Sequence, residues 1–187
     1  MRNERQMMRG TDWLGEPVAG CYASRKLNGV ACLWDGSQAW TRSGNRIALP
    51  AHIRATLPAI ALDCEIISGE GGNVDFTAAS LAVRLNRWTP DIHAVAFDAP
   101  TMPGDWLQRI EAARAAGSPC VSWTVCKGET DLLWLFDRIT KPGGEGVMFR
   151  KPGIRYRPGR ALFGFWKVKW SPEICSLMDF LPYTVAA

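Results

Sequence analysis

The sequence predicts a fold of the α+β class, with two largely antiparallel sheets and flanking helices. Three observations indicate this class. Short stretches with strand-like alternation of apolar residues are separated by tight-turn signals. Three segments with helical start signals are interspersed among them. The chain has 187 residues, of which 47% are hydrophobic and 21% charged, so it can fill one compact core and is not an intrinsically disordered protein.

Alternating apolar residues, bounded by glycine, proline and aspartate, predict the strands. Asp35-Gly36 is a strong signal for a tight hairpin turn between two of them. The cluster from Gly69 to Gly72 ends another strand, and Pro100 stops the next. In chain order, the predicted strands cover residues 21–34, 38–42, 59–67, 92–98, 120–126, 146–149 and 162–170. Because hairpins join antiparallel neighbours, we expect the sheets to be largely antiparallel.

Three segments between these strands predict helices. Asp75 and Asp105 are placed to cap the first two, and Gly117 follows the end of the second. The third begins near Thr130, carries apolar residues on one side and closes at Lys141-Pro142. Helices interspersed among hairpins are typical of the α+β class rather than of a regular βαβ fold.

Composition narrows the class of protein further. Twenty-two Lys and Arg against 18 Asp and Glu give a net charge of +4, which is compatible with a polyanionic partner.

No stretch is long and apolar enough to cross a bilayer, and Met1–Gly10 lacks the apolar segment of a secretory signal, so we expect a cytoplasmic protein that does not bind membranes. The six cysteines include no CxxC pair, which favours free thiols over disulfides or a zinc site.

Carboxylates lie at two points where a strand could present them to a ligand. Asp63 and Glu65 are two residues apart in an apolar strand, so strand geometry sends both to one face. Glu145 lies between glycines at the mouth of another strand, where a ligand can approach the backbone. Taken singly, the Gly143–Gly146 segment is more typical of an ordinary turn.

Three lysines are uninformative singly but indicate an anion-binding site when they are considered together. Lys26, followed by Gly29, is alone typical of an exposed residue before a bend. Lys167 and Lys169 share one face of a strand, where they repel each other unless an anion lies over them. A solvated edge strand would carry the same two lysines.

Taken together in chain order, these lysines and carboxylates resemble the motifs of the covalent nucleotidyltransferase family of ATP-dependent DNA ligases. The resemblance extends from about Tyr22 to Lys169, most of the chain, and is greatest to small bacterial and phage ligases. The matching motifs are Lys26-x-x-Gly29, Arg42, Asp63-x-Glu65, Phe97-Asp98, Glu145-Gly146-Val147-Met148 and Lys167-x-Lys169. It implies the catalytic-domain fold of DNA ligases and mRNA capping enzymes, an ATP-grasp-like arrangement that encloses a nucleotide cleft.

The resemblance implies that Lys26 attacks the α-phosphate of ATP to form a covalent lysyl-AMP. A free lysine has a pKa of about 10.4, so nearby cations are needed to favour the neutral amine. Lys167 and Lys169 would supply such cations, bind the phosphates and stabilise the charge that develops on them. AMP then passes to a DNA 5′-phosphate, and the 3′-hydroxyl displaces it to seal the nick.

The resemblance also assigns the residues that hold nucleotide and metal. Phe97 would stack on adenine, although plain core packing is the alternative. Glu65 would accept a hydrogen bond from the ribose, and Arg42 would contact the ribose or the 5′-phosphate of the nick. Glu145, with Glu65, would help to hold Mg²⁺ or Mn²⁺.

A cluster of cations predicts a surface that faces nicked double-stranded DNA. Five cations within eleven residues alternate with glycine, proline and tyrosine, as suits a loop that follows phosphates with little base recognition. The predicted DNA contacts are Arg42, Arg150, Lys151, Arg155, Arg157 and Arg160. A solvated basic loop is the alternative.

The chain departs from the family pattern in several places. Asn28 stands where the motif usually has an acid, Ala31 where it has an arginine, and Arg25 where a glutamate commonly precedes the nucleophile. We expect an N-terminal extension over 1–20, a nucleotidyltransferase domain over 21–187, and no OB-fold domain. A monomer, acting alone or with a separate protein that supplies the clamp, is therefore expected.

Two other functions compete with a DNA ligase. An RNA ligase or a GTP-using capping enzyme would share the covalent chemistry, although Thr41–Asn45 and Gly143–Gly153 resemble DNA ligases more closely. A degenerate relative that binds nucleotide or DNA without catalysis would share the fold. The presence of Lys26 together with Glu65, Glu145, Lys167 and Lys169 argues against this alternative, because a non-catalytic protein does not need the nucleophile.

Overall fold

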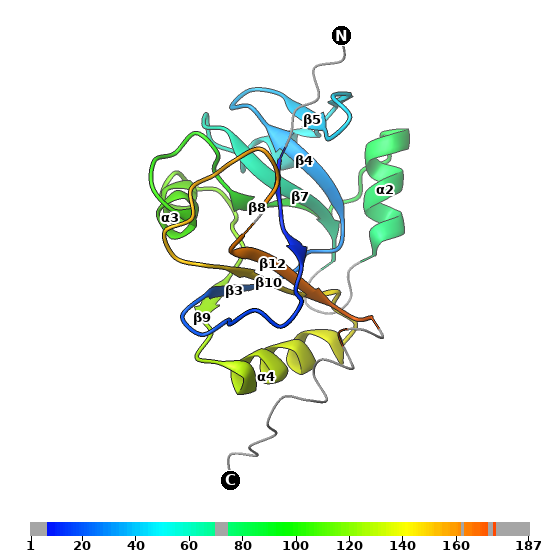
Figure 1. Cartoon of the computed structure of the whole chain (residues 1–187). Helices are drawn as coiled ribbons and strands as arrows, with labels where there is room; N and C mark the ends of the chain where they lie inside the picture. The colour runs from blue at the N-terminus through cyan, green and yellow to red at the C-terminus, as the bar shows by residue number, and fades with distance from the viewer. Residues whose placement is uncertain (1–6, 70–74, 162, 172–173, 175–187) are drawn as a thin grey trace.

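The computed structural model describes residues 7–69, 75–161, 163–171 and 174. These residues form two five-stranded sheets and one two-stranded sheet, flanked by helices (Figure 1). The first sheet has the order β2 (Thr11–Asp12), β12 (Phe165–Lys169), β10 (Gly146–Arg150), β3 (Tyr22–Arg25) and β9 (Trp123–Val125). The second has the order β6 (Arg46–Ile47), β5 (Ala39–Thr41), β4 (Val30–Trp34), β7 (Leu62–Ser68) and β8 (Ile92–Asp98). The two-stranded sheet joins β1 (Met8–Arg9) to β11 (Gly159–Arg160).

Strand pairing within the two larger sheets is antiparallel except between β2 and β12. The α+β class with largely antiparallel sheets is thus confirmed. Residues 8–12, in the segment expected as an N-terminal extension, add one parallel strand to each of two sheets.

The predicted strand over residues 21–34 is two strands, which belong to different sheets. The chain leaves β3 after Arg25, crosses between the sheets as residues 26–29, and enters β4 at Val30. Gly29 passes so close to β7 that a Cβ at this position would collide with the backbone oxygen of Ile66. The four residues of the crossing are too few to show a pattern of their own, which explains the single predicted strand. The crossing places Lys26 where the two sheets meet.

The helices are α1 (Ala51–Arg54), α2 (Phe76–Leu85), α3 (Trp106–Ala115) and α4 (Glu129–Thr140) within the described residues. The predicted caps are confirmed. Asp75 accepts hydrogen bonds from the backbone N–H groups of Thr77 and Ala78, and Asp105 forms a capping box with Gln108. The third predicted helix begins at Glu129, one residue before the predicted start. Helix α1 was not predicted, because four residues are too few to show helical periodicity.

The two larger hydrophobic clusters lie on the outer faces of the two larger sheets. One joins β4, β7 and β8 to Ala79 and Ala82 of α2. The other joins β10 and β12 to Leu132 and Phe136 of α4. Two smaller clusters, one around Trp106 of α3 and one around Phe165 of β12, occupy part of the inner faces, and the rest of these faces lines a site between the sheets. The five described cysteines are free thiols, as expected, and Cys175 lies outside the described residues. In the described ranges, no helix combines the length and hydrophobicity that crossing a bilayer requires.

Candidate active site

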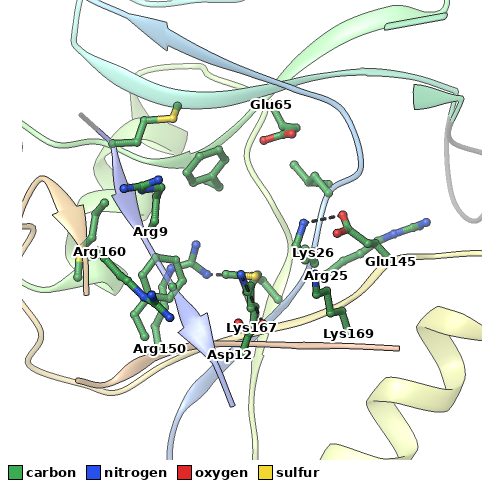
Figure 2. A pocket seen from close by; sticks show the side chains of 18 of the residues that line it. Arg9, Asp12, Arg25, Lys26, Glu65, Glu145, Arg150, Arg160, Lys167 and Lys169 are labelled. Atoms are coloured by element: carbon green, nitrogen blue, oxygen red, sulfur yellow. Dashed lines mark hydrogen bonds and ion pairs between the residues drawn. The ribbon is translucent and has the colours of Figure 1, made fainter. Parts of the chain in front are cut away.

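A cavity of about 590 Å³ lies between the two larger sheets (Figure 2). It receives side chains from both sheets, from the crossing segment 26–29 and from the N-terminal strands. The residues predicted for catalysis and nucleotide binding all line it: Lys26, Arg42, Glu65, Phe97, Glu145, Lys167 and Lys169. Residues distant in sequence thus come together as predicted, while their roles stay predictions.

Strand alternation explains why these side chains meet. In β12, Phe165, Lys167 and Lys169 line the cavity, whereas Trp166 and Val168 pack into the core beneath. In β7 and β8 the same period sends Glu65 and Phe97 to the cavity, between residues that face the other core. The facing sides of the sheets therefore carry the charged side chains of the cavity together with apolar ones, and Phe97 also packs against the cluster around Trp106 and Ile110.

Lys26 and Glu145 form the closest charged contact in the cavity. The Lys26 Nζ donates a hydrogen bond to the Glu145 Oε2 at 2.5 Å. The backbone N–H of Lys26 donates to the carbonyl oxygen of Gly146 at 2.7 Å, which fixes the crossing segment against β10. The two side chains are only 23% and 30% exposed. Glu145 therefore anchors the amine of Lys26 at the side of the cavity.

Glu65 is a half-buried carboxyl group among charges of both signs. Burial raises its pKa to about 7; the positive charges of Lys26 and Arg42 oppose this rise, while the negative charge of Glu145 adds to it. Glu65 is therefore a mixture of protonated and ionised forms near neutral pH, and it can donate or accept a hydrogen bond.

The N-terminal strands contribute residues that were not predicted for the site. Asp12 lies opposite Lys167 in the β2–β12 register, and its Oδ1 is 3.4 Å from the Lys167 Nζ. Arg9, from β1, also lines the cavity. Both belong to two-residue strands, which carry no periodic signal, so only the cation and the carboxylate themselves could have marked them.

The predicted basic surface divides into a buried part and an exposed part. Arg150 is buried, and its guanidinium carbon lies 4.5 Å from the Trp106 ring centroid and 4.4 Å from that of Phe165. It donates a hydrogen bond to the Ser24 Oγ at 3.1 Å, and burial lowers its pKa to about 10. Arg150 thus lies in the wall of the cavity, unlike the exposed DNA contact predicted for it.

The other cations of this segment are exposed. Arg160 lines the cavity, whereas Lys151, Arg155 and Arg157 do not. The Nζ of Lys151 lies 4.8 Å from the ring centroid of Phe163. A surface contact with DNA stays a prediction for these residues.

The remaining acids of the motifs have structural contacts. Asp98 forms a buried ion pair with Arg109, with nitrogen–oxygen distances of 2.7 and 3.0 Å. Asp63 accepts a hydrogen bond from the Tyr156 hydroxyl at 2.6 Å, and burial raises its pKa to about 7. Neither lines the cavity, so of the two carboxylates predicted to share a strand face only Glu65 reaches it.

The carboxylates of the cavity suit a metal that is bound together with phosphate. The described residues contain no group of three or more His, Cys, Asp or Glu that could hold an ion by itself. Glu65 and Glu145 both line the cavity. Mg²⁺ is commonly held by one or two carboxylates plus phosphate oxygens and water, so this donor set fits.

Comparisons with known proteins find DNA ligases that are similar to this chain. No family model matches the chain. A DNA ligase of Haemophilus influenzae is 26% identical over 153 residues, which cover 78% of this chain. The chain spans 57% of the length of that protein.

Solved structures of DNA ligases share the fold. A Lig E DNA ligase has a TM-score of 0.72 and 25% identity, with 88% of this chain and 68% of that chain covered. The Chlorella virus DNA ligase-adenylate has a TM-score of 0.70 and 21% identity (89% and 67% covered). The ATP-dependent DNA ligase of bacteriophage T7 in complex with ATP has a TM-score of 0.65 and 15% identity (89% and 69% covered). The resemblance in the motifs is thus confirmed: the chain is similar in sequence to DNA ligases and has the fold of the catalytic domain of ATP-dependent DNA ligases.

Proposed function

We propose that the chain is the catalytic core of an ATP-dependent DNA ligase and uses Lys26 as its nucleophile. The observation that carries this proposal is the convergence of an amine, two carboxylates, two strand lysines and an aromatic ring on one cavity. The amine of Lys26 is anchored by Glu145, and Lys167 and Lys169 lie on a neighbouring strand. Such a set is suited to transfer of a nucleotidyl group through a lysine.

In the first step, the neutral amine of Lys26 attacks the α-phosphorus of ATP. A nitrogen–phosphorus bond forms, the bond from that phosphorus to the β-phosphate oxygen breaks, and pyrophosphate leaves, while the Nζ gives up a proton. Lys167 and Lys169 would stabilise the negative charge on the phosphate oxygens, because fixed cations in an enclosed site lower the barrier.

The rest of the cavity would orient the nucleotide. Phe97 would stack on the adenine, and the apolar side chain of Met148 lines the same cavity. Glu65 would bind a ribose hydroxyl, and Arg42 would contact the ribose or a phosphate. Each of these contacts holds the α-phosphate within reach of Lys26, which lowers the entropy lost in the reaction.

Glu145 and Glu65 would hold Mg²⁺ or Mn²⁺ when nucleotide is bound. A divalent ion neutralises charge on the phosphates. Glu145 is also the carboxylate that contacts the Lys26 amine in the free protein.

DNA enters the reaction in the second step. An oxygen of the 5′-phosphate attacks the phosphorus of the lysyl-AMP, the nitrogen–phosphorus bond breaks, and Lys26 regains its proton. The 3′-hydroxyl then attacks the activated 5′-phosphate, loses its proton and releases AMP. The exposed cations Arg155, Arg157 and Lys151 would bind the DNA backbone during these steps.

A substrate competition tests this function. ATP or GTP labelled on the α-phosphate would be supplied with nicked duplexes whose two strands at the nick are DNA or RNA. We expect transfer of label from ATP to the 5′-phosphate of DNA, followed by sealing. Transfer from GTP alone, or to RNA alone, would assign another covalent nucleotidyltransferase activity. Binding of both substrates without any transfer of label would assign a non-catalytic binding module.

A further inference from the structure

Two arginines from distant parts of the sequence lie directly opposite each other at the cavity. Strands β1 and β11 pair in parallel, with Arg9 in register with Arg160. The N–H of Ala161 donates to the carbonyl oxygen of Arg9 at 2.8 Å, so the pairing continues beyond the arginines. Both side chains are exposed, and both line the cavity. Like charges directly opposite on neighbouring strands repel and destabilise the pair.

No acidic residue in the described part of the chain forms an ion pair with either arginine. Two of the three carboxylates that line the cavity have other partners: Glu145 contacts Lys26, and Asp12 contacts Lys167. The charge of the arginine pair is thus not neutralised by a contact within the described chain.

The pair lies at the end of the cavity away from the proposed nucleophile. Figure 2 shows Arg9 and Arg160 on one side of the cavity, and Lys26, Glu145 and Lys169 on the other. Arg150 lies at the same end as the pair. Its Nε is the one buried side-chain nitrogen or oxygen in the described residues that lacks a hydrogen-bond partner. Three guanidinium groups with incomplete partners thus gather at this end.

We propose that Arg9 and Arg160 together bind a backbone phosphate of a polynucleotide, an inference that rests on the proposed function. Planar guanidinium groups bind phosphate oxygens in pairs of hydrogen bonds, and an anion between them would remove their repulsion. A polynucleotide is favoured over the phosphates of a nucleotide because the pair lies far from Lys26. The segment that carries Arg160 also carries the exposed Arg155 and Arg157, which would continue the phosphate contacts.

The N-terminal strand is held in place by a chain of two hydrogen bonds. The backbone N–H of Met8 donates to the Tyr156 hydroxyl at 3.0 Å, and that hydroxyl donates to the Asp63 Oδ2 at 2.6 Å. This chain ties β1 to β7 through the segment before β11. Tyr156 is therefore a positioning residue for Arg9, and Tyr156→Phe should weaken phosphate binding by Arg9 without removing a charge.

The salt dependence of DNA binding tests the arginine pair. Affinity for a nicked duplex would be measured without nucleotide at a series of KCl concentrations, for the wild type, Arg9→Ala, Arg160→Ala and the double variant. Because the two arginines share one phosphate, the double variant should reduce the magnitude of the slope of log affinity against log salt by about 0.9, and each single variant should reduce it by less. Arg54→Ala, which removes an exposed arginine from α1 outside the cavity, should leave the slope unchanged.

Formation of lysyl-AMP from ATP without DNA, measured in parallel, separates the outcomes. We expect the same rate and the same half-saturating ATP concentration in Arg9→Ala and Arg160→Ala as in the wild type. A slope equal to the wild type in the double variant would overturn the proposal. A raised half-saturating ATP concentration with an unchanged slope would overturn it too and assign the pair to the nucleotide. If the wild type forms no lysyl-AMP and the slopes still fall, the proposed function fails while the phosphate site stands.

Discussion

The folded structure raises the pKa of the Glu65 carboxyl group, so this group ionises less readily than it does in the unfolded chain. Its pKa is about 7 in the folded protein and 4.5 ordinarily. Between these values the folded state binds more protons than the unfolded state, so the contribution of Glu65 to stability is complete below pH 4.5 and is lost as the pH rises through 7. The ionised Glu65 at alkaline pH thus opposes folding.

We expect Glu65→Gln to stabilise the protein only at alkaline pH. The free energy of unfolding should rise by about 1–2 kcal/mol at pH 8, because one pKa unit corresponds to about 1.4 kcal/mol, and should gain nothing near pH 4. Denaturant unfolding at both pH values measures this difference. A loss of stability at both would show that the carboxylate is stabilised by its cationic neighbours instead.

Glu145 and Lys167 are expected to act in the chemistry and not in folding. Glu145→Ala removes the anchor of the Lys26 amine, and Lys167→Ala removes a cation from the cavity. Each should slow lysyl-AMP formation by about 100-fold or more, as does loss of one group that stabilises transition-state charge. Quenched-flow or gel assays with labelled ATP measure the rate, and circular dichroism checks the fold.

The exposed Lys127 offers a matched control for these substitutions. It precedes α4 and does not line the cavity. Lys127→Ala should keep the wild-type rate of lysyl-AMP formation. Near-normal rates in both Glu145→Ala and Lys167→Ala would contradict the roles assigned to the two residues.

The pairing of β10 with β12 positions Glu145 and the two strand lysines relative to each other. Gly146 begins β10 with a φ of 150°, and a Cβ there would collide with the backbone oxygen of Val168. Any side chain at this position must therefore push β10 away from β12. Because Glu145 is the preceding residue, its contact with Lys26 depends on this close approach.

Gly146→Ala should therefore lower both stability and activity. We expect a loss of about 2–4 kcal/mol in the free energy of unfolding, from backbone strain and overpacking together. Gly117→Ala is the control, because Gly117 also has a positive φ, of 90°, but has open space at the Cβ position. It should lose only about 1 kcal/mol and keep full activity. Equal losses in the two variants would show that the collision at Gly146 is relieved without moving the strand.

The elements that could be predicted are those with a repeating local signal. Strand β8 alternates in burial over all seven residues, and Asp75 and Asp105 are local capping signals, so these elements were predicted close to their bounds. Strand β7 alternates between apolar and polar residues only from Leu62 to Ile66, and it begins three residues later than predicted. The break between β3 and β4 was missed because the four residues between them, 26–29, are too few to carry a periodic signal of their own. It follows from contact of Gly29 with β7, which lies more than thirty residues away in the sequence.

The site was predictable where its residues belong to motifs, and not where only the fold brings them in. Lys26, Glu65 and Lys167 lie in motifs and were expected together, and the cavity joins them. Arg9 and Asp12 reach the same cavity through two-residue strands that pair with β11 and β12. No pattern within residues 8–12 predicts that pairing, since two residues show no periodicity and the register depends on β11 and β12.

Taken as one molecule, the chain encloses a cavity between two sheets, and it places Lys26 where the chain crosses from one sheet to the other. The account depends on this lysine becoming covalently bound to AMP. Intact mass after incubation with ATP and Mg²⁺, for the wild type and Lys26→Ala, tests it most directly. We predict that the wild type gains the mass of one AMP and that Lys26→Ala gains none. A wild type that stays unmodified across metals and pH, or a Lys26→Ala variant that is still modified, would contradict the account.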